Sequence, residues 1–250
     1  MSFGTIIIGD EILSGKRQDK HLSKLIEVLK VRGLELAWAQ YLGDEPEQII
    51  ATLKRTLASD DSVFCFGGIG ATPDDCTRQS AAAAAGVALV RHPEAVAEIE
   101  ARFGQDAYPK RILMAEFPAG SEAIPNPFNR IPGFSYARHY FLPGFPEMAW
   151  PMMEWVLDSR YLHLHHGRPR IEESLVVFEA PESELIDAMN TVLSNYDAVK
   201  VSSLPRFAPT GREIELSVRG DPAQVPSAMS YLKVAVTTLG YRYEASTRKP

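Results

Sequence analysis

The sequence predicts an α/β fold with a mostly parallel sheet covered by helices on both faces, followed by a small α+β domain. Up to about residue 103, short apolar runs alternate with helical segments, as expected for parallel strands joined by helical crossovers. After residue 170 the expected order changes to β-α-β-β-α. For a chain of 250 residues, we expect a first domain over 1–160, a linker over 161–170 and a small domain over 171–250.

The first domain begins with a repeating strand and helix pattern. Leu22, Leu25 and Leu29 fall on one face of a helix that ends at Gly33, and the later helices have similar spacing. The apolar runs between the helices are short and continuous, as in strands that are buried on both faces. The expected strands are 3–9, 34–41, 62–66 and 87–91, and the expected helices lie around 22–33, 49–57, 73–86 and 93–103.

A proline-rich stretch, 104–133, interrupts this pattern and has only one short helical segment, near 111–116. Long loops in compact domains tend to be functional, so we expect this insertion to lie near the site. A strand over 134–142 and a helix from Pro146 to about Asp158 complete the domain.

Residues 63–77 carry the main functional signal, because a buried strand leads directly into glycines and a helix start. The expected features are a strand at Val63–Phe66, a turn at Gly67, Gly68 and Gly70, an N-cap at Thr72, Pro73 at the first helical position and Asp75 at the third. A glycine turn followed by a helix N-terminus presents backbone amides to an anion. The loop lacks the Gly-Lys-Ser/Thr ending of a P-loop and the third small residue of the dinucleotide fingerprint.

Two carboxylates, Asp74 and Asp75, follow this loop. Beside a phosphate they would repel the ligand unless a cation or a proton separates the charges. This predicts a phosphorylated ligand with a divalent metal, most simply Mg²⁺, which prefers one or two carboxylates plus substrate phosphate. The alternative is a plain capping box with a glycine turn, since acids are common in the first turn of helices.

Composition excludes several other classes of protein. The net charge of −6 and the pI near 5.6 argue against a non-specific nucleic-acid binder. We expect no membrane association and no signal peptide, because no apolar run is long enough and the first residues lack a basic region. Cys65 and Cys76 are too few for a disulfide framework or a zinc site, which favours a reducing cytoplasm.

The order of elements predicts that the small domain is a KH-type or ferredoxin-like unit. Strands are expected at 174–178, 198–201 and 213–218, with helices around 185–193 and 226–239. From residue 168 onward ten basic residues face eleven acids, so no RNA-binding face is expected. In the linker, His163, His165 and His166 have no accompanying acid or cysteine cluster, which favours a structural or solvated role over a metal site.

Five motifs occur in the order found in the molybdopterin-binding domain family of molybdenum-cofactor biosynthesis. The chain most resembles the subgroup formed by the N-terminal part of competence/damage-inducible protein A, over residues 3 to about 158. The segment Lys200–Arg206 is similar to the small domain that follows in that subgroup. The motifs are Gly9–Gly15, Gly43-Asp44, Gly67–Arg78, Ile124–Pro127 with Pro132–Phe134, and Leu142–Met148.

The resemblance implies a three-layer α/β/α fold, assembly into dimers or trimers, and a pocket at the carboxyl ends of the strands. The ligand would be a phosphorylated pterin such as molybdopterin, or a nucleotide pyrophosphate. In the cofactor-making members, the acids that match Asp44 and Asp75 serve metal-dependent adenylyl transfer, whereas the subgroup is associated with pyrophosphatase activity on ADP-ribose-like molecules. The subgroup usually carries Asp-Thr-Asn where this chain has Asp19-Lys20-His21. Because the chain ends at Pro250, we do not expect the nicotinamide-mononucleotide deamidase activity of longer members.

The expected site combines these observations. Asp44 and Asp75 are the expected catalytic and metal-binding acids, with Asp74 as a weaker metal ligand. The expected ligand- and phosphate-binding residues are Gly67, Gly68, Gly70, Thr72, Ser14, Pro143 and Gly144.

Several neighbouring residues have two possible roles. Asp10 and Glu11 either join the metal shell or form the turn, Glu147 is favoured as a helix-start acid, and Arg78 either reaches a phosphate or is solvated. For the whole protein, the enzyme hypothesis is a metal-dependent nucleotide pyrophosphatase or adenylyl transferase. The alternative is a non-catalytic module that carries molybdopterin or a nucleotide.

Overall fold

The computed structural model describes residues 2–167, 170–208 and 211–246. The chain divides into two compact units, Met1–His165 and His166–Pro250, each with its own hydrophobic core. The boundary after His165 falls inside the stretch that we expected to be the linker. In the part of the chain that the structure describes, no helix is long and apolar enough to cross a membrane.

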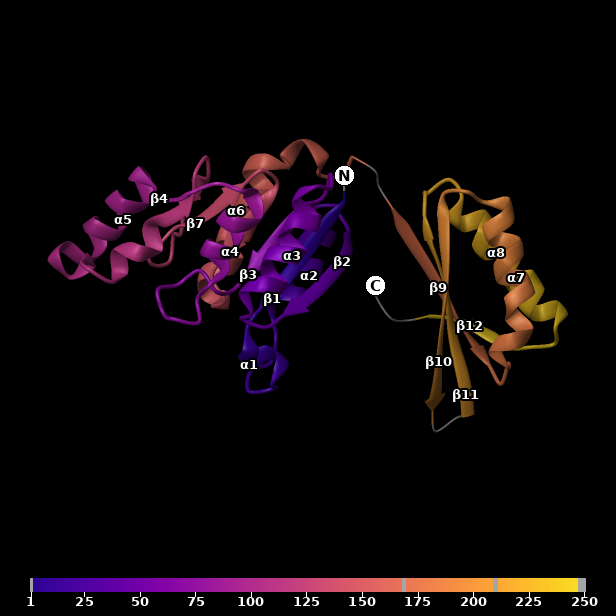
Figure 1. Cartoon of the computed structure of the whole chain (residues 1–250). Coiled ribbons are helices and arrows are strands. Elements are labelled where there is room, and N and C mark those ends of the chain that lie inside the picture. Colours follow the sequence, from indigo (N-terminus) through magenta and orange to yellow (C-terminus); the bar gives the residue numbers. More distant parts are fainter. Residues whose placement is uncertain (1, 168–169, 209–210, 247–250) are drawn as a thin grey trace. The chain divides into compact units, whose positions relative to one another are not determined.

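The first unit is built on a six-stranded sheet in the order β2-β1-β3-β8-β7-β6 (Figure 1). Four neighbouring strands run parallel, and β7 and β6 are antiparallel additions at one edge. The strands are β1 Phe3–Ile8, β2 Leu36–Leu42, β3 Ser62–Phe66, β6 Glu122–Ile124, β7 Gly133–Tyr136 and β8 His139–Leu142.

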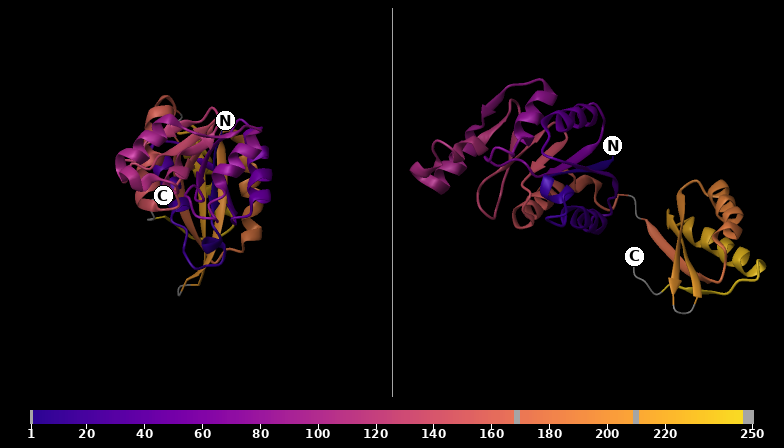
Figure 2. Two further views of the ribbon diagram at one scale, coloured as in Figure 1. Left: turned by 60° about the vertical axis from the view of Figure 1, so that its left-hand side comes forward. Right: turned by 60° about the horizontal axis from the view of Figure 1, so that its bottom comes forward.

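Helices cover both faces of this sheet, which confirms the predicted three layers (Figure 2). Successive residues of β1 point to opposite faces, so Ile6 joins the core formed with α3 and α4, and Ile7 joins the core formed with α2 and α6. The helices of this unit are α1 Asp10–Leu13, α2 His21–Val31, α3 Pro46–Leu57, α4 Thr77–Ala85, α5 Pro93–Phe103 and α6 Pro146–Arg160, with 3₁₀ helices η1 Gly104–Ala107, η2 Arg111–Ala115 and η3 Leu162–Leu164.

Two strand predictions are wrong in detail. The run 87–91 does not join the parallel sheet, because β4 (Leu89–Arg91) pairs antiparallel with β5 (Glu116–Pro118) in a separate two-stranded sheet. The run 134–142 is a hairpin and not one strand, with Ala137 at a φ of 51° in its turn. The hairpin brings β8 beside β3 in the main sheet, where the two strands run parallel.

The second unit is a four-stranded antiparallel sheet in the order β10-β11-β9-β12, with both helices on one face (Figure 1). Its β-α-β-β-α-β order and strand arrangement are those of the ferredoxin-like fold. Sequence patterns miss β12, which is only three residues long and half-exposed. The elements are β9 Ile171–Phe178, α7 Glu182–Asn195, β10 Val199–Ala208, β11 Gly211–Gly220, α8 Val225–Thr238 and β12 Tyr243–Ala245.

Gly67 carries the chain out of β3 at a point where no side chain fits. Its φ is +104°, and a Cβ atom there would lie 2.1 Å from the backbone oxygen of Ile8, the last residue of β1. Gly120 also has a positive φ, +89°, but has open space around it. Alanine substitutions at these two glycines therefore distinguish the steric cost of a methyl group from the cost of a positive φ.

We expect Gly67→Ala to lower the free energy of unfolding by on the order of 3 kcal/mol, because the backbone of β1 must move. Gly120→Ala should cost only about 1 kcal/mol, the penalty for a positive φ alone. Urea denaturation followed by circular dichroism measures both values. Equal losses in the two variants would show that the contact with Ile8 does not constrain the strand ends.

His139 begins β8 and is 1% exposed. Its Nε2 lies 2.8 Å from the hydroxyl of Thr56 in α3. Burial, with a smaller contribution from Arg138, lowers the pKa of His139 to about 4. The folded protein therefore holds this imidazole neutral at a pH where the unfolded chain protonates it.

We expect the free energy of unfolding to fall as the pH decreases from about 6.5 to about 4, by on the order of 3 kcal/mol from this residue. In that window the unfolded state binds a proton that the folded state does not, so stability rises with pH. Urea titrations at several pH values should give a shallower slope for His139→Gln. The exposed His163→Gln is the matched control, and a variant slope equal to that of this control would contradict the assignment.

Candidate functional site at the carboxyl ends of the parallel strands

The loops that follow β1, β2, β3 and β8 start side by side. The Gly9 amide donates to the Leu42 oxygen at 3.0 Å, and the Gly67 amide donates to the Leu142 oxygen at 3.0 Å. Figure 1 shows α1 projecting from this end of the sheet. The carboxyl edge of a parallel sheet is where open α/β folds bind ligands, so the predicted motifs meet at the expected place.

Asp10 and Asp44 bind each other through reciprocal hydrogen bonds. The Asp10 amide donates to Oδ2 of Asp44 at 2.9 Å, and the Asp44 amide donates to Oδ1 of Asp10 at 3.2 Å. Among the described residues, the second oxygen of each carboxylate has no hydrogen-bond partner. A Cβ atom on Gly43 would lie 2.6 Å from Oδ1 of Asp10, so a side chain at this position would displace the Asp10 carboxylate. The pair ties the loop after β1 to the loop after β2.

Asp44 lies among other acids. Burial raises the pKa of Asp44, the amide of Asp10 opposes this shift, and the charges of Asp10, Glu11 and Asp74 raise the pKa further. The structure thus brings Asp44 together with Asp10, Glu11 and Asp74. Repulsion of this kind is what a bound cation would relieve, and carboxylate oxygens are the ligands that Mg²⁺ prefers.

Asp75 stabilises the turn of its own loop. Its Oδ2 accepts the amide of Thr72 at 2.9 Å and also accepts the hydroxyl of Thr72. The Asp75 amide in turn donates to the Thr72 oxygen at 3.0 Å, which closes a turn. These contacts use one oxygen of the carboxylate, Oδ2, and the metal-binding role of Asp75 stays a prediction.

The predicted helix start is wrong because of the same turn. Thr72 donates its hydroxyl to Asp75 instead of accepting an amide, so residues 72–75 form a closed turn and α4 begins only at Thr77. The Thr77 amide donates to the Gly68 oxygen at 3.0 Å. The glycine loop therefore folds back onto the start of α4, and its amides are presented by this folded loop and not by a helix that starts at Thr72.

The glycines allow side chains of the same loop to pack closely against its backbone. A Cβ atom would lie 2.2 Å from Oγ1 of Thr77 at Gly68, and 2.4 Å from Oδ2 of Asp75 at Gly70. The Thr77 hydroxyl is fully buried and has no hydrogen-bond partner among the described residues. Thr77 is a candidate ligand-binding residue that the analysis of spacing did not select.

Arg78 takes neither of its two expected roles. It is 2% exposed, and its guanidinium donates to the oxygens of Gly70 at 2.7 Å, Glu116 at 3.3 Å and Leu113. Burial lowers the pKa of Arg78, and the charges of Glu116 and Asp75 oppose this effect. Arg78 therefore holds the glycine loop against the stretch 111–118, which belongs to the insertion expected near the site.

His21 stands where the subgroup usually has an asparagine. Its ring stacks on Phe66, the last residue of β3, with a centroid distance of 4.4 Å, and its Nε2 lies 3.1 Å from the Gly144 oxygen. Burial lowers the pKa of His21, which favours a neutral imidazole that donates from Nε2. Gly144 lies beside the glycine loop, because a Cβ atom on Gly144 would be 3.5 Å from Cα of Gly67. By binding the Gly144 oxygen, His21 therefore holds Gly144 next to this loop.

The remaining predicted residues lie in the surrounding loops. Ser14 is exposed at the end of α1, Pro143 and Gly144 connect β8 to α6, and Glu147 lies in the first turn of α6. Ser14 uses its backbone amide to reach the Asp10 oxygen at 2.8 Å.

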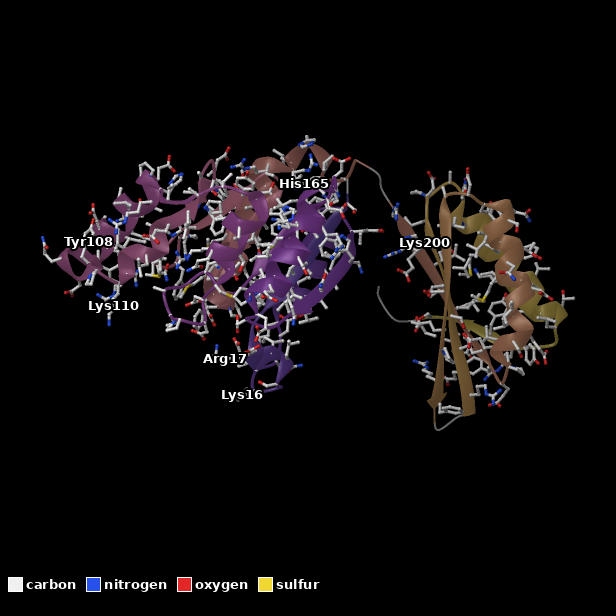
Figure 3. The ribbon with its side chains drawn as sticks, in the orientation of Figure 1. Lys16, Arg17, Tyr108, Lys110, His165 and Lys200 are labelled. Atoms are coloured by element: carbon white, nitrogen blue, oxygen red, sulfur yellow. The ribbon has the colours of Figure 1, made fainter. Side chains whose placement is uncertain are left out.

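Two further residues belong to this edge and were missed. The guanidinium of Arg17 lies over the ring of Phe145, 5.8 Å from its centroid, and the Arg17 amide donates to the Glu11 oxygen at 2.9 Å. Phe145 is 51% exposed. Figure 3 shows Lys16 and Arg17 on the loop that follows α1. For Arg17, the sequence signal was its position just after the motif Gly9–Gly15, and for Phe145 it was its position inside the motif Leu142–Met148.

The described residues contain no group of three or more His, Cys, Asp or Glu side chains arranged to hold a metal ion. A site with one or two carboxylates, completed by phosphate oxygens of the ligand, does not require such a group. Magnesium binding at Asp44 therefore stays a prediction.

Comparison with known proteins agrees with this geometry. The family described as "Probable molybdopterin binding domain" matches residues 4–163. A CinA-like protein of Anaeromyxobacter sp. (strain Fw109-5) is 33% identical over 195 residues, covering 75% of this chain and 47% of the relative. A CinA-like protein of Citrifermentans bemidjiense is 30% identical over 254 residues, covering 98% of this chain and 59% of the relative. The chain thus spans about half the length of these curated relatives.

A solved structure shares the fold of the first unit. The crystal structure of the protein CinA with unknown function from Thermoplasma acidophilum has a TM-score of 0.58 and 26% sequence identity, covering 63% of this chain and 96% of that chain. The family match covers well over half of the 250 residues and includes all the loops of the site. The chain belongs to the molybdopterin-binding domain family, and its domain is of the CinA type.

Proposed function

We propose that the carboxyl edge of the parallel sheet binds a phosphorylated pterin or a nucleotide pyrophosphate together with a divalent cation, and hydrolyses ADP-ribose-like or FAD-like pyrophosphates. The carrying observation is the gathering of Asp10, Glu11 and Asp74 around Asp44 beside the glycine loop. The mutual repulsion of these carboxylates destabilises the protein without a ligand. A bound cation would remove this repulsion, which is why we include one in the site.

Recognition of phosphate would come from the glycine loop and its neighbours. Gly67, Gly68 and Gly70 bring backbone close to the ligand, and the buried Thr77 hydroxyl is available as a partner. Arg17 contributes a positive charge at the same edge, where the exposed ring of Phe145 offers a flat apolar surface. These groups suit a ligand that combines phosphate with a planar ring.

The metal would be held by Asp44 and Asp10, with Asp74 nearby. When bound, a divalent cation neutralises phosphate charge and lowers the pKa of a coordinated water. Asp75 maintains the turn with Thr72, and Arg78 keeps the Gly70 carbonyl in place.

A second function is a non-catalytic module that holds molybdopterin or a nucleotide. One observation favours it: Asp10 and Asp44 each use a carboxylate oxygen to accept the other's amide, which leaves fewer oxygens to hold a metal and orient a water. Binding needs only the loop amides and one cation, whereas hydrolysis also needs an oriented water.

Asp44→Asn separates function from stability. Asparagine keeps an oxygen to accept the Asp10 amide but removes one charge from the acidic cluster. Because the folded state raises the pKa of Asp44, its ionised form costs stability above the pKa of the unfolded chain, and we expect the variant to melt at the same or a higher temperature. Affinity for ADP-ribose in the presence of Mg²⁺ should fall at least about tenfold, by loss of a charge-assisted contact.

Differential scanning fluorimetry and isothermal titration calorimetry measure these two effects. Asp187→Asn, an exposed change of the same type in α7, should leave both values at the wild-type level. If Asp44→Asn retains full magnesium-dependent affinity, Asp44 is not in the site.

A substrate panel decides between the two functions. We expect incubation with ADP-ribose, FAD, NAD and ATP, each with Mg²⁺, Mn²⁺ or Co²⁺, to release monophosphates from ADP-ribose or FAD, as followed by phosphorus NMR. Wild-type binding without any turnover across the panel would refute the hydrolase and leave the carrier module.

A further inference from the structure

A second candidate site lies in the ferredoxin-like unit and is independent of the proposed function. A hollow of about 680 Å³ opens where β10 begins and β11 ends. Small-molecule sites typically have volumes of about 300–1,000 Å³. Three cationic side chains line the hollow: Arg170, Lys200 and Arg219.

Two of these cations face each other across the sheet. Lys200 and Arg219 are directly opposite in the antiparallel β10–β11 ladder. Val199 and Val218, one position earlier on each strand, belong to the core under the helices, so Lys200 and Arg219 point to the helix-free face. Figure 3 shows Lys200 extending away from the helices of its unit. On its other side Arg219 lies opposite Glu172 of β9, so Lys200 is the outermost charge of this row.

Among the described residues, Lys200 has no hydrogen bond or ion pair. Two acids also line the hollow, but both accept hydrogen bonds from the chain beside α8. Oδ1 of Asp221 accepts the Ala223 amide at 2.8 Å, and Oδ1 of Asp197 accepts the side chain of Gln224 at 2.8 Å. The hollow therefore has a fixed wall and a cation that is left for a ligand.

We propose that this hollow binds a small polyphosphate, either inorganic or the phosphate end of a small organic molecule. Arginine binds phosphate through a planar pair of N–H groups, and lysine adds a compact positive charge, so the set suits adjacent phosphate groups. A nucleic acid is disfavoured because the unit from residue 168 carries ten basic and eleven acidic residues, so it has no excess of positive charge. A lysine on an edge strand can also serve only to prevent strand pairing, and this is the rival explanation to test.

Titration of the full chain with pyrophosphate, in EDTA to suppress metal-dependent binding at the first unit, tests the proposal. We expect amide NMR signals of residues 199–200 and 219–221 to shift. Isothermal titration calorimetry should show Lys200→Gln weakening affinity at least about tenfold, with Lys200→Arg close to wild type. The control is Lys233→Gln, which removes a lysine of α8 outside this hollow and should bind like wild type.

Three results would overturn the proposal. One is that the amide signals of residues 199–200 and 219–221 do not shift. This result counts against the proposal even if the signals of residues 67–78 shift. Another is equal affinity of Lys200→Gln and Lys233→Gln, which would leave the edge-protection role. The third is a single-stranded oligonucleotide that displaces pyrophosphate and binds more tightly, which would make the hollow a nucleic-acid site. Because EDTA and the Lys200 variants leave the first unit's acids unchanged, failure here does not bear on the proposed function.

Discussion

Four parallel strands end side by side, and hydrogen bonds across their ends fix where each loop of the site begins. The Gly9 amide reaches β2 and the Gly67 amide reaches β8, so β1 and β3 in the centre of the sheet are each tied to an outer neighbour. Gly67 has no room for a side chain against β1. The positions of Asp44, the glycine loop and Gly144 all follow from this arrangement.

The acidic cluster shows a conflict between stability and function. Asp10 and Asp44 accept hydrogen bonds from each other's amides, which stabilises the two loops. The charges of Asp10 and Asp74, however, oppose ionisation of Asp44. A protein selected only for stability would not collect these charges in one place. Asp75 is different, because its bonds to Thr72 hold the loop closed. The two acids that looked equivalent in sequence thus make different contacts: Asp44 links the loops after β1 and β2, and Asp75 closes a turn within its own loop.

The same reasoning applies to the second unit. Its core is complete, with Leu175, Val218 and Leu232 fully buried beneath two helices. The facing cations at Lys200 and Arg219 have no purpose in that core. In both units, charged side chains gather where the packed core does not require them, and the two binding proposals rest on this observation.

Local patterns in the sequence determined most elements, the three layers and the motifs of the site, because apolar spacing, glycines and prolines act within a few residues. The run Val63–Phe66 is a strand, and Pro46, Pro93 and Pro146 begin helices, as their types require. Only the tertiary structure decided that β4 leaves the main sheet, that Asp75 binds Thr72, and that Arg78 and His21 support the glycine loop. These outcomes depend on contacts between residues far apart in the chain or on which of two possible hydrogen bonds forms, and neither is encoded in local spacing.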